Sequence, residues 1–297
     1  MSPIDDPADS RAEAGPIRRL LLALDSSIPN RATLREAARL AQRLDAELTT
    51  LFVEDINLMN LAELPFVRHT SLLSGVAEHV DATIMEAMLR ARAAEARRAL
   101  EDIAAAGALR WSFRTVRGRI AEQVIAAAVD QDLLLIGWTT RSRDDTRFAS
   151  LRIRKRPALG RAGSTVRSIA GGSRRPVLLL RDGSILDRPV VVVFDGSAGG
   201  TRALIAAASL ARVVGQALVV LTIGPETLAE QARAALSGVP ELTISHRPLR
   251  RPSVATVCAA QAESGGGIVV LDAESPLLAE DGDNPLSGFA CPVLLAR

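Results

Sequence analysis

Short apolar runs alternate with amphipathic segments along most of this chain. Leu20–Leu24 is a continuous apolar run, typical of a strand buried on both faces of a parallel sheet. After the polar residues Asp25-Ser26-Ser27, Arg31–Leu44 carries apolar residues at helical spacing. Glu47–Val53 predicts a second strand, and Trp111–Val116 alternates like a half-buried strand near a sheet edge. Strands that alternate with helices predict right-handed crossovers and a parallel sheet.

Further elements are predicted up to residue 180. An apolar stripe at helical spacing indicates a helix that ends near Gly107; it consists of Val76, Val80, Ile84, Met88 and Ala91. Asp132–Ile136 and Pro176–Leu180 read as buried strands. Between them, Ser164–Ala170 predicts a short helix with Ser164 as its N-cap.

The pattern then starts again, which indicates an internal duplication. Val190–Phe194 with Asp195-Gly196-Ser197 repeats the opening strand and its polar turn, and Pro292–Arg297 repeats Pro176–Arg181. We therefore predict an unstructured tail at residues 1–15 and two α/β domains, at residues 16–183 and 187–297. Each domain would pack against the other within one chain.

Composition narrows the class of protein. Hydrophobic residues make up 48% and charged residues 24% of the 297 positions, as expected of a packed core. The apolar runs of four or five residues are far shorter than a membrane-spanning helix needs, and the N-terminal tail has no signal-peptide pattern. We expect a cytoplasmic protein with no membrane insertion.

The charged, cysteine and histidine residues give little further information about function. Arginine residues cluster between Arg141 and Arg175, which indicates either an anionic partner or a solvated loop; we do not expect nucleic acid as the partner. The two cysteines, Cys258 and Cys291, lie in apolar segments and read as small core residues. The three histidines have no partner at ligand spacing, so no metal site is expected.

Two features could bind a ligand at the ends of the strands. Asp25 follows the first strand, where a carboxylate can accept hydrogen bonds from ribose hydroxyls or cap the next helix. Gly163-Ser164-Thr165 opens a helix, whose free N–H groups favour an anion such as phosphate. The same Gly-Ser pair is also an ordinary turn and cap.

Three stretches resemble the universal stress protein family. They are the opening Leu20–Ser27, the segment Val116–Gly137, and Gly163–Val177, which is similar to the family's closing Gly-Ser helix and Pro-Val strand. The resemblance covers nearly all of Ile17–Asp182 and, more weakly, Asp187–Arg297. It implies two Rossmann-like domains related to adenine nucleotide alpha hydrolases, each an open five-stranded parallel sheet in the order 3-2-1-4-5.

The resemblance also implies an ATP site in the first domain only. Asp25 would face the ribose, and Leu24 and Val53 would border the adenine. The remaining residues would contact phosphates: Ile136 and Gly137 at the start of the phosphate loop, and Gly163, Ser164 and Thr165 at the helix start.

The sequence departs from the family's ATP motif, G-x2-G-x9-G-[ST], in both halves. Thr140 replaces the second motif glycine, and the arginine-rich insert lengthens the path to Gly163. In the second half Asp272 stands where a phosphate-loop glycine belongs, and acidic residues follow it. A carboxylate there would repel phosphate, so we interpret the second domain as degenerate.

Two functions remain open. The first is a stress-response or regulatory protein that binds ATP in its first domain. The second is a nucleotide-free interaction module or regulatory subunit, with Glu54–Leu73 contacting a protein partner or a second copy in a homodimer, or else capping its own sheet. No catalytic motif such as G-x-x-x-x-G-K-[ST] or G-x-S-x-G is present, so we expect no enzymatic activity.

Overall fold

The computed structural model of the chain places most of both halves. It describes residues 17–24, 31–62, 68–70, 77–79, 82–138, 162–181, 186–239, 242–249, 252–279 and 285–297. The predicted tail at residues 1–15, the residue Asp25 and the arginine-rich insert up to residue 161 lie outside these ranges.

Five parallel strands form the sheet of the first half. They are adjacent in the order β5-β2-β1-β6-β7, which is 3-2-1-4-5 when the five are counted along the chain. Their bounds are β1 Arg19–Leu24, β2 Glu47–Asp55, β5 Trp111–Gly118, β6 Leu133–Trp138 and β7 Val177–Arg181. The central strands are apolar on both faces because helices cover both sides, whereas β5 lies at the edge, as its alternating pattern predicts.

Helices cover this sheet on two sides. α1 (Arg31–Arg43) and α3 (Ala82–Ala105) pack on one face, and α4 (Ile120–Ala127) and α5 (Ala162–Gly172) pack on the other. Between β2 and α3, α2 (Ile56–Ala62) is followed by the small antiparallel pair β3 (Arg68–Thr70) and β4 (Ala77–His79). Within the described ranges, no helix combines the length and the apolar character needed to cross a bilayer.

The helix stripe predicted before Gly107 was wrong in two respects. β4 occupies part of the expected helix, so α3 begins only at Ala82. Ile84 is 44% exposed, and the buried side of α3 instead carries Met85 and Leu89, which lie one position further along. The buried row continues through Ala93, Ala96 and Leu100. Small alanine side chains, which a hydrophobicity pattern weights little, therefore define the packing face.

The second half repeats this architecture. Its strands lie in the order β10-β9-β8-β11-β12, again 3-2-1-4-5, and all four pairings are parallel. The strands are β8 Val190–Phe194, β9 Leu218–Thr222, β10 Ile244–Pro248, β11 Val269–Asp272 and β12 Val293–Ala296. The helices are α6 Ala198–Val214, α7 Thr227–Ala235 and α8 Val254–Glu263, with the 3-10 turns η1 Pro276–Leu278 and η2 Pro285–Gly288 between β11 and β12.

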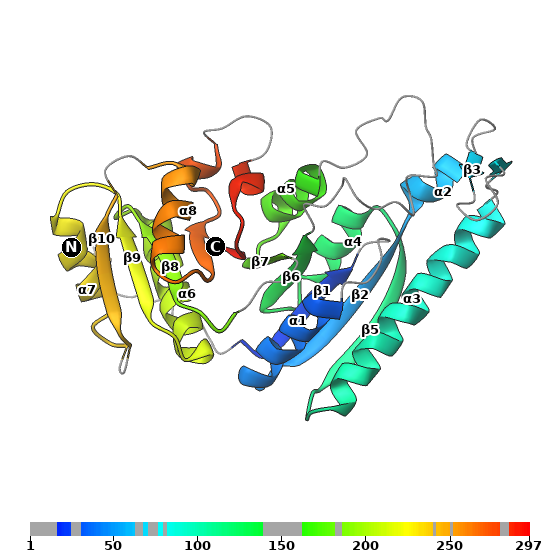
Figure 1. Cartoon of the computed structure of the whole chain (residues 1–297), viewed down its shortest axis with the longest axis horizontal. Helices are drawn as coiled ribbons and strands as arrows, with labels where there is room; N and C mark the ends of the chain where they lie inside the picture. Colours follow the sequence, from blue (N-terminus) through cyan, green and yellow to red (C-terminus); the bar gives the residue numbers. More distant parts are fainter. Residues whose placement is uncertain are drawn as a thin grey trace, which may run out of the picture.

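The fifth strands of the two halves pair with each other and make one sheet of ten strands. β7 and β12 are antiparallel, with Val293 opposite Leu179 and Leu295 opposite Val177. Figure 1 shows the halves side by side with β7 and the C-terminus at the centre. The mostly parallel α/β fold flanked by helices is confirmed. The two five-stranded units are not separate open sheets, however, and the predicted domain boundaries stay a prediction.

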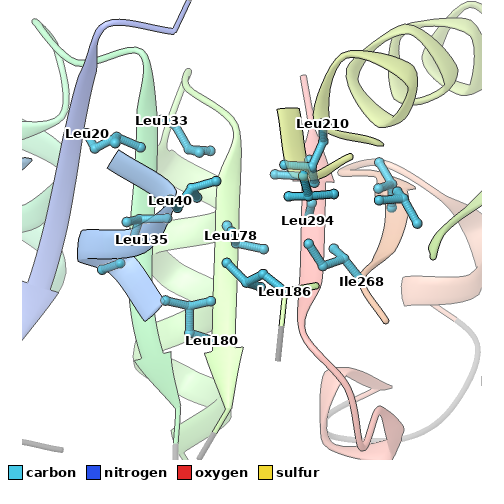
Figure 2. Close-up of a cluster of buried hydrophobic side chains, with 14 of the residues drawn as sticks. Leu20, Leu40, Leu133, Leu135, Leu178, Leu180, Leu186, Leu210, Ile268 and Leu294 are labelled. Atoms are coloured by element: carbon cyan, nitrogen blue, oxygen red, sulfur yellow. The ribbon is translucent and has the colours of Figure 1, made fainter. Parts of the chain in front are cut away.

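The hydrophobic core runs across this junction without a break. Leu178 and Leu180 of β7, Leu186 of the connecting segment and Leu294 of β12 belong to one buried cluster (Figure 2). The helices that follow the first strand of each half, α1 and α6, also contact each other on this face. The two halves therefore bury a shared apolar interior.

Polar contacts reinforce the junction symmetrically. Arg181 ends β7 and donates to the carbonyl of Phe289 in the second half. The repeat-equivalent Arg297 directly follows β12 and donates to the carbonyls of Ala170 and Gly171 in α5. On the other face Arg43 of α1 donates to the carbonyl of Val214 at 3.1 Å. The duplicated Pro-Val-Leu-Leu strands thus end in arginines that cross to the opposite half in both directions.

Both cysteines pack in the second half. Cys291 is 8% exposed and Cys258 is half-buried, with its Sγ 3.6 Å from the carbonyl oxygen of Gly288. Burial raises the pKa of Cys291 to about 12. A thiol with so high a pKa stays protonated at neutral pH and is a poor nucleophile. These residues therefore act as small packing groups.

One histidine of the second half has no hydrogen bond to any described residue. His246 is on β10, on the same face of the strand as Ile244, and both of its ring nitrogens are buried with no partner among the described residues. Burial, and next the charge of Arg233 on α7, lowers the pKa of His246 below its usual value. The folded protein therefore favours the neutral form of the His246 imidazole.

We predict that His246 makes the protein sensitive to acid. Its folded pKa is depressed, so its stabilising contribution is complete above its ordinary unfolded pKa of about 6.5 and is lost as pH falls through the folded pKa. His246→Leu should flatten the decline of unfolding free energy over that pH window, measured by urea denaturation. Arg233→Gln should raise the pKa of His246 in an NMR titration. An unchanged pH profile in His246→Leu would contradict this account.

Candidate functional site at the carboxyl edge of the sheet

Four of the residues singled out from the sequence meet at the carboxyl edge of the first half. Leu24 ends β1 and is opposite Phe52, and Val53 is the next residue of β2. Ile136 and Gly137 lie at the same level of β6, where Gly137 is opposite Leu180 of β7. The chain leaves β1 toward β2 on one side and returns to β6 on the other. Such a reversal of strand order is where open α/β sheets bind ligands.

Gly137 is the open point of this edge. It is exposed, whereas Leu24, Val53 and Ile136 beside it are all buried. A Cβ atom at Gly137 would lie 3.1 Å from Cγ2 of Thr33 in the first turn of α1. The absence of a side chain therefore lets α1 approach β6 closely. It also leaves the backbone at the end of β6 accessible to a ligand.

The helix start singled out from the sequence lies in the first turn of α5. Gly163, Ser164 and Thr165 are the second to fourth residues of a helix that begins at Ala162. The prediction of Ser164 as N-cap was therefore wrong. The buried positions Val166 and Ile169 indicate which side of this helix packs on the sheet. They do not indicate at which residue the helix begins.

The direction of α5 follows from its far end. Ala170 and Gly171, near its C-terminus, contact Arg297, which directly follows β12, the strand antiparallel to β7. The beginning of α5 must then lie toward the carboxyl edge, where Gly137 is. The free N–H groups of its first turn and the partial positive charge there favour an anion. Asp25, Thr140 and the insert lie outside the described residues, so their positions in the site stay predictions.

A charged network that the sequence analysis did not single out closes the same edge beside β2. Arg117 of β5 is opposite Glu54 of β2 and donates to it at 3.0 Å, and Arg117 also donates to Glu86 of α3 at 2.6 Å. Arg90 pairs with Glu86 from the next turn at 3.1 Å. The hydrogen bond from Arg117 lowers the pKa of Glu86 below its usual value. Glu54 has only 9% of its side chain exposed.

This network holds α3 against the end of the sheet and keeps the buried Glu54 paired. A buried carboxylate without a partner would be strongly unfavourable. The sequence signal that could have revealed it is a charged residue directly after the buried run of β2. Its pairing with Arg117 could not be read without the strand register.

The corresponding edge of the second half is filled by the protein itself. Asp272 is opposite Ala296 of β12 as Gly137 is opposite Leu180 of β7, so the two residues occupy equivalent places. A Cβ atom at Gly199, in the first turn of α6, would overlap the Asp272 carboxylate. Arg202 of the same helix lies 3.5 Å from Asp272 Oδ1. The carboxylate thus rests against the first turn of α6.

Asp195, the counterpart of Asp25, is also engaged locally. Its Oδ1 accepts hydrogen bonds from the backbone N–H of Ser197 at 2.9 Å and from the Ser197 hydroxyl at 2.6 Å. Ser197 in turn caps α6 by accepting from the N–H of Gly200 at 2.9 Å. Two carboxylates therefore interact with the start of α6, which would repel a phosphate.

Comparison of the structure with known proteins shows what the fold resembles. A universal stress protein from Archaeoglobus fulgidus DSM 4304 superposes with a TM-score of 0.65 at 15% identity, covering 94% of this chain and 96% of that one. A functionally unknown protein from Pseudomonas aeruginosa PAO1 superposes with a TM-score of 0.51 at 15% identity, covering 94% and 92%. No family profile and no curated protein matches the sequence.

The match to the archaeal protein extends over nearly the whole of both chains. The chain therefore has the fold of the universal stress proteins over 94% of its length. At 15% identity this similarity shows the fold alone.

We predict that Gly199 lacks a side chain because Asp272 occupies that space. Gly199→Ala should lower the free energy of unfolding by about 1–3 kcal/mol, the usual cost of overpacking. In an Asp272→Ala background the added methyl group finds room, so the same substitution should cost much less. The measurement is a double-mutant cycle by urea denaturation. An equal cost of Gly199→Ala in both backgrounds would show that the carboxylate does not fill this space.

Proposed function

We propose that this chain is a tandem universal stress protein, a cytoplasmic regulatory protein that binds one ATP in its first half and does not use it catalytically. The adenine would lie beside Leu24 and Val53, with Asp25 on the ribose. Ile136, Gly137 and the turn Gly163-Ser164-Thr165 would face the phosphates.

The contrast between Gly137 and Asp272 carries this proposal. In the first half the next-to-last residue of the fourth strand is an exposed glycine, at the edge toward which α5 begins. In the second half the equivalent residue is a carboxylate packed on the first turn of a helix. An anion is favoured where a helix begins with free backbone N–H groups and is disfavoured where a carboxylate already occupies the space. One nucleotide per chain is the stoichiometry that follows.

A second function is supported by a separate observation. α2 packs on α3 through Leu58 and Met59, which contact Met85 and Leu89. Ile56 of α2 and Ile84 of α3 are 38% and 44% exposed. Exposed isoleucines next to a partly covered helix favour a contact with a protein partner or a second copy. Under this alternative the chain would be an interaction module that needs no nucleotide.

The tandem repeat provides matched variants for the test. Asp25→Ala should weaken ATP binding roughly tenfold to a hundredfold, because a hydrogen bond to a charged group contributes about 1.5–3 kcal/mol. Asp195→Ala, the same change in the second half, should leave the affinity unchanged. Titration calorimetry should give one site per chain for the unmodified protein.

Two outcomes would contradict the ATP proposal. One is the absence of heat at millimolar ATP, which would leave the interaction module as the better account. The other is an equal loss of affinity in Asp25→Ala and Asp195→Ala. Circular dichroism of each variant checks that the fold is intact, since Asp195 also binds the turn before α6.

A further inference from the structure

A groove lies between α1 and α3 on the face of the sheet that these two helices cover. Its volume is about 340 Å³. Ala38 of α1 and Ala99 of α3 form part of its floor, and both are nearly fully buried. Because these side chains are small, the helices leave an open channel between them.

Arginines from α1 line one wall of this groove. Arg31, Arg35 and Arg39 are spaced by four residues, so they form one row along the helix. At a rise of about 1.5 Å per residue, neighbouring members of the row are about 6 Å apart and the row is about 12 Å long. Gln42 extends the same wall by nearly one turn.

The arginines are incompletely neutralised. Arg31 pairs with Asp102 of α3 at 3.2 Å, and Arg39 pairs with Glu36 at 2.8 Å. Arg35 has no carboxylate partner in the part of the chain that the structure describes. Glu36 also accepts the backbone N–H of Leu186 at 3.5 Å, and only 12% of its side chain is exposed. Three guanidinium groups are therefore balanced by only two carboxylates. One of these carboxylates, Glu36, also faces Leu186 of the connecting segment.

We propose that this groove binds an extended phosphate chain, independently of the site at the carboxyl edge. Guanidinium groups form forked, charge-assisted hydrogen bonds with phosphate oxygens. A chain with negative charge on every unit can contact more members of a row spaced about 6 Å apart than a single phosphate, which can bridge at most neighbouring members. The small side chains of Ala38 and Ala99 leave room for such a chain beside α1. The ligand is a phosphate chain that is either free or attached to a nucleoside.

The first probe is tripolyphosphate, titrated into the full-length protein by calorimetry at low salt. The chain contains other arginines, notably between Arg141 and Arg175, so the contrast between variants is the test and binding alone is not. Arg35→Ala should weaken binding roughly tenfold, as expected for loss of a charge-assisted hydrogen bond. Asp102→Asn should strengthen binding several-fold, because it frees Arg31 and removes a competing negative charge. Orthophosphate should bind much more weakly than tripolyphosphate.

Arg97→Ala is the matched control. Arg97 is an exposed arginine of α3 that pairs with Glu101 and does not line the groove. Its loss should leave the affinity unchanged. Equal affinity in Arg35→Ala and the unmodified protein would overturn the proposal, and so would an equal loss in Arg97→Ala. Weaker binding in Asp102→Asn would also overturn it.

A second arm distinguishes the two sources of the phosphate chain. In the Asp25→Ala background, which weakens the proposed nucleotide site, ATP and tripolyphosphate are compared directly. Equal affinities for the two ligands mean that the groove contacts only the phosphate chain. A higher affinity for one of them shows whether the groove prefers a free or a nucleoside-linked phosphate chain. In each case the bound ligand must be sensitive to Arg35→Ala. Failure of ATP binding at the carboxyl edge does not affect this result, because the groove is lined by different residues.

Discussion

The antiparallel pairing of β7 with β12 joins the two halves of the chain into a single sheet. Each is the fifth strand of its half and is almost wholly apolar. Left unpaired, each would be an exposed hydrophobic edge with free backbone groups, the feature that soluble proteins avoid. Pairing the two removes both edges at once, and the buried cluster on each face of the sheet extends through both halves.

The same pairing sets the geometry of any ligand site. All strands of one half are antiparallel to those of the other, so the two carboxyl edges lie at opposite ends of the sheet. A ligand at one edge cannot contact the corresponding edge of the other half. The halves can therefore diverge at these edges without disturbing the junction. Gly137 and Asp272 illustrate this divergence: equivalent places in the sheet have an open glycine in one half and a packed carboxylate in the other.

Much of the fold could be predicted from the sequence because buried parallel strands are continuous apolar runs. Leu20–Leu24, Val190–Phe194 and their neighbours are of this kind, and their repetition indicates two similar halves. The start of α3 was not predictable, because its packing face is built largely from alanines and a two-stranded unit precedes it. The fusion of the two sheets was also not predicted, because nothing in the residue pattern of β7 or β12 indicates that these two strands pair with each other.

The candidate site was predictable only in part. Residues at the ends of strands, such as Leu24 and Gly137, follow from the position of the strands alone. Pairs formed across the fold, such as Glu54 with Arg117 or Asp272 with Gly199, depend on strand register and on how a helix sits over the sheet. Single-sequence reasoning supplies neither quantity. It could identify Asp272 as an unusual residue at its position but not the space that its carboxylate fills.

Native-state hydrogen exchange can show whether one continuous sheet unites the two halves. The backbone amides that β7 and β12 direct toward each other should exchange as slowly as those of the central strands β1, β6, β8 and β11, because opening them requires global unfolding. The outward-facing amides of the edge strands β5 and β10 should exchange much faster. If the amides between β7 and β12 exchange as fast as those outer edges, the halves are separate sheets and the account is wrong.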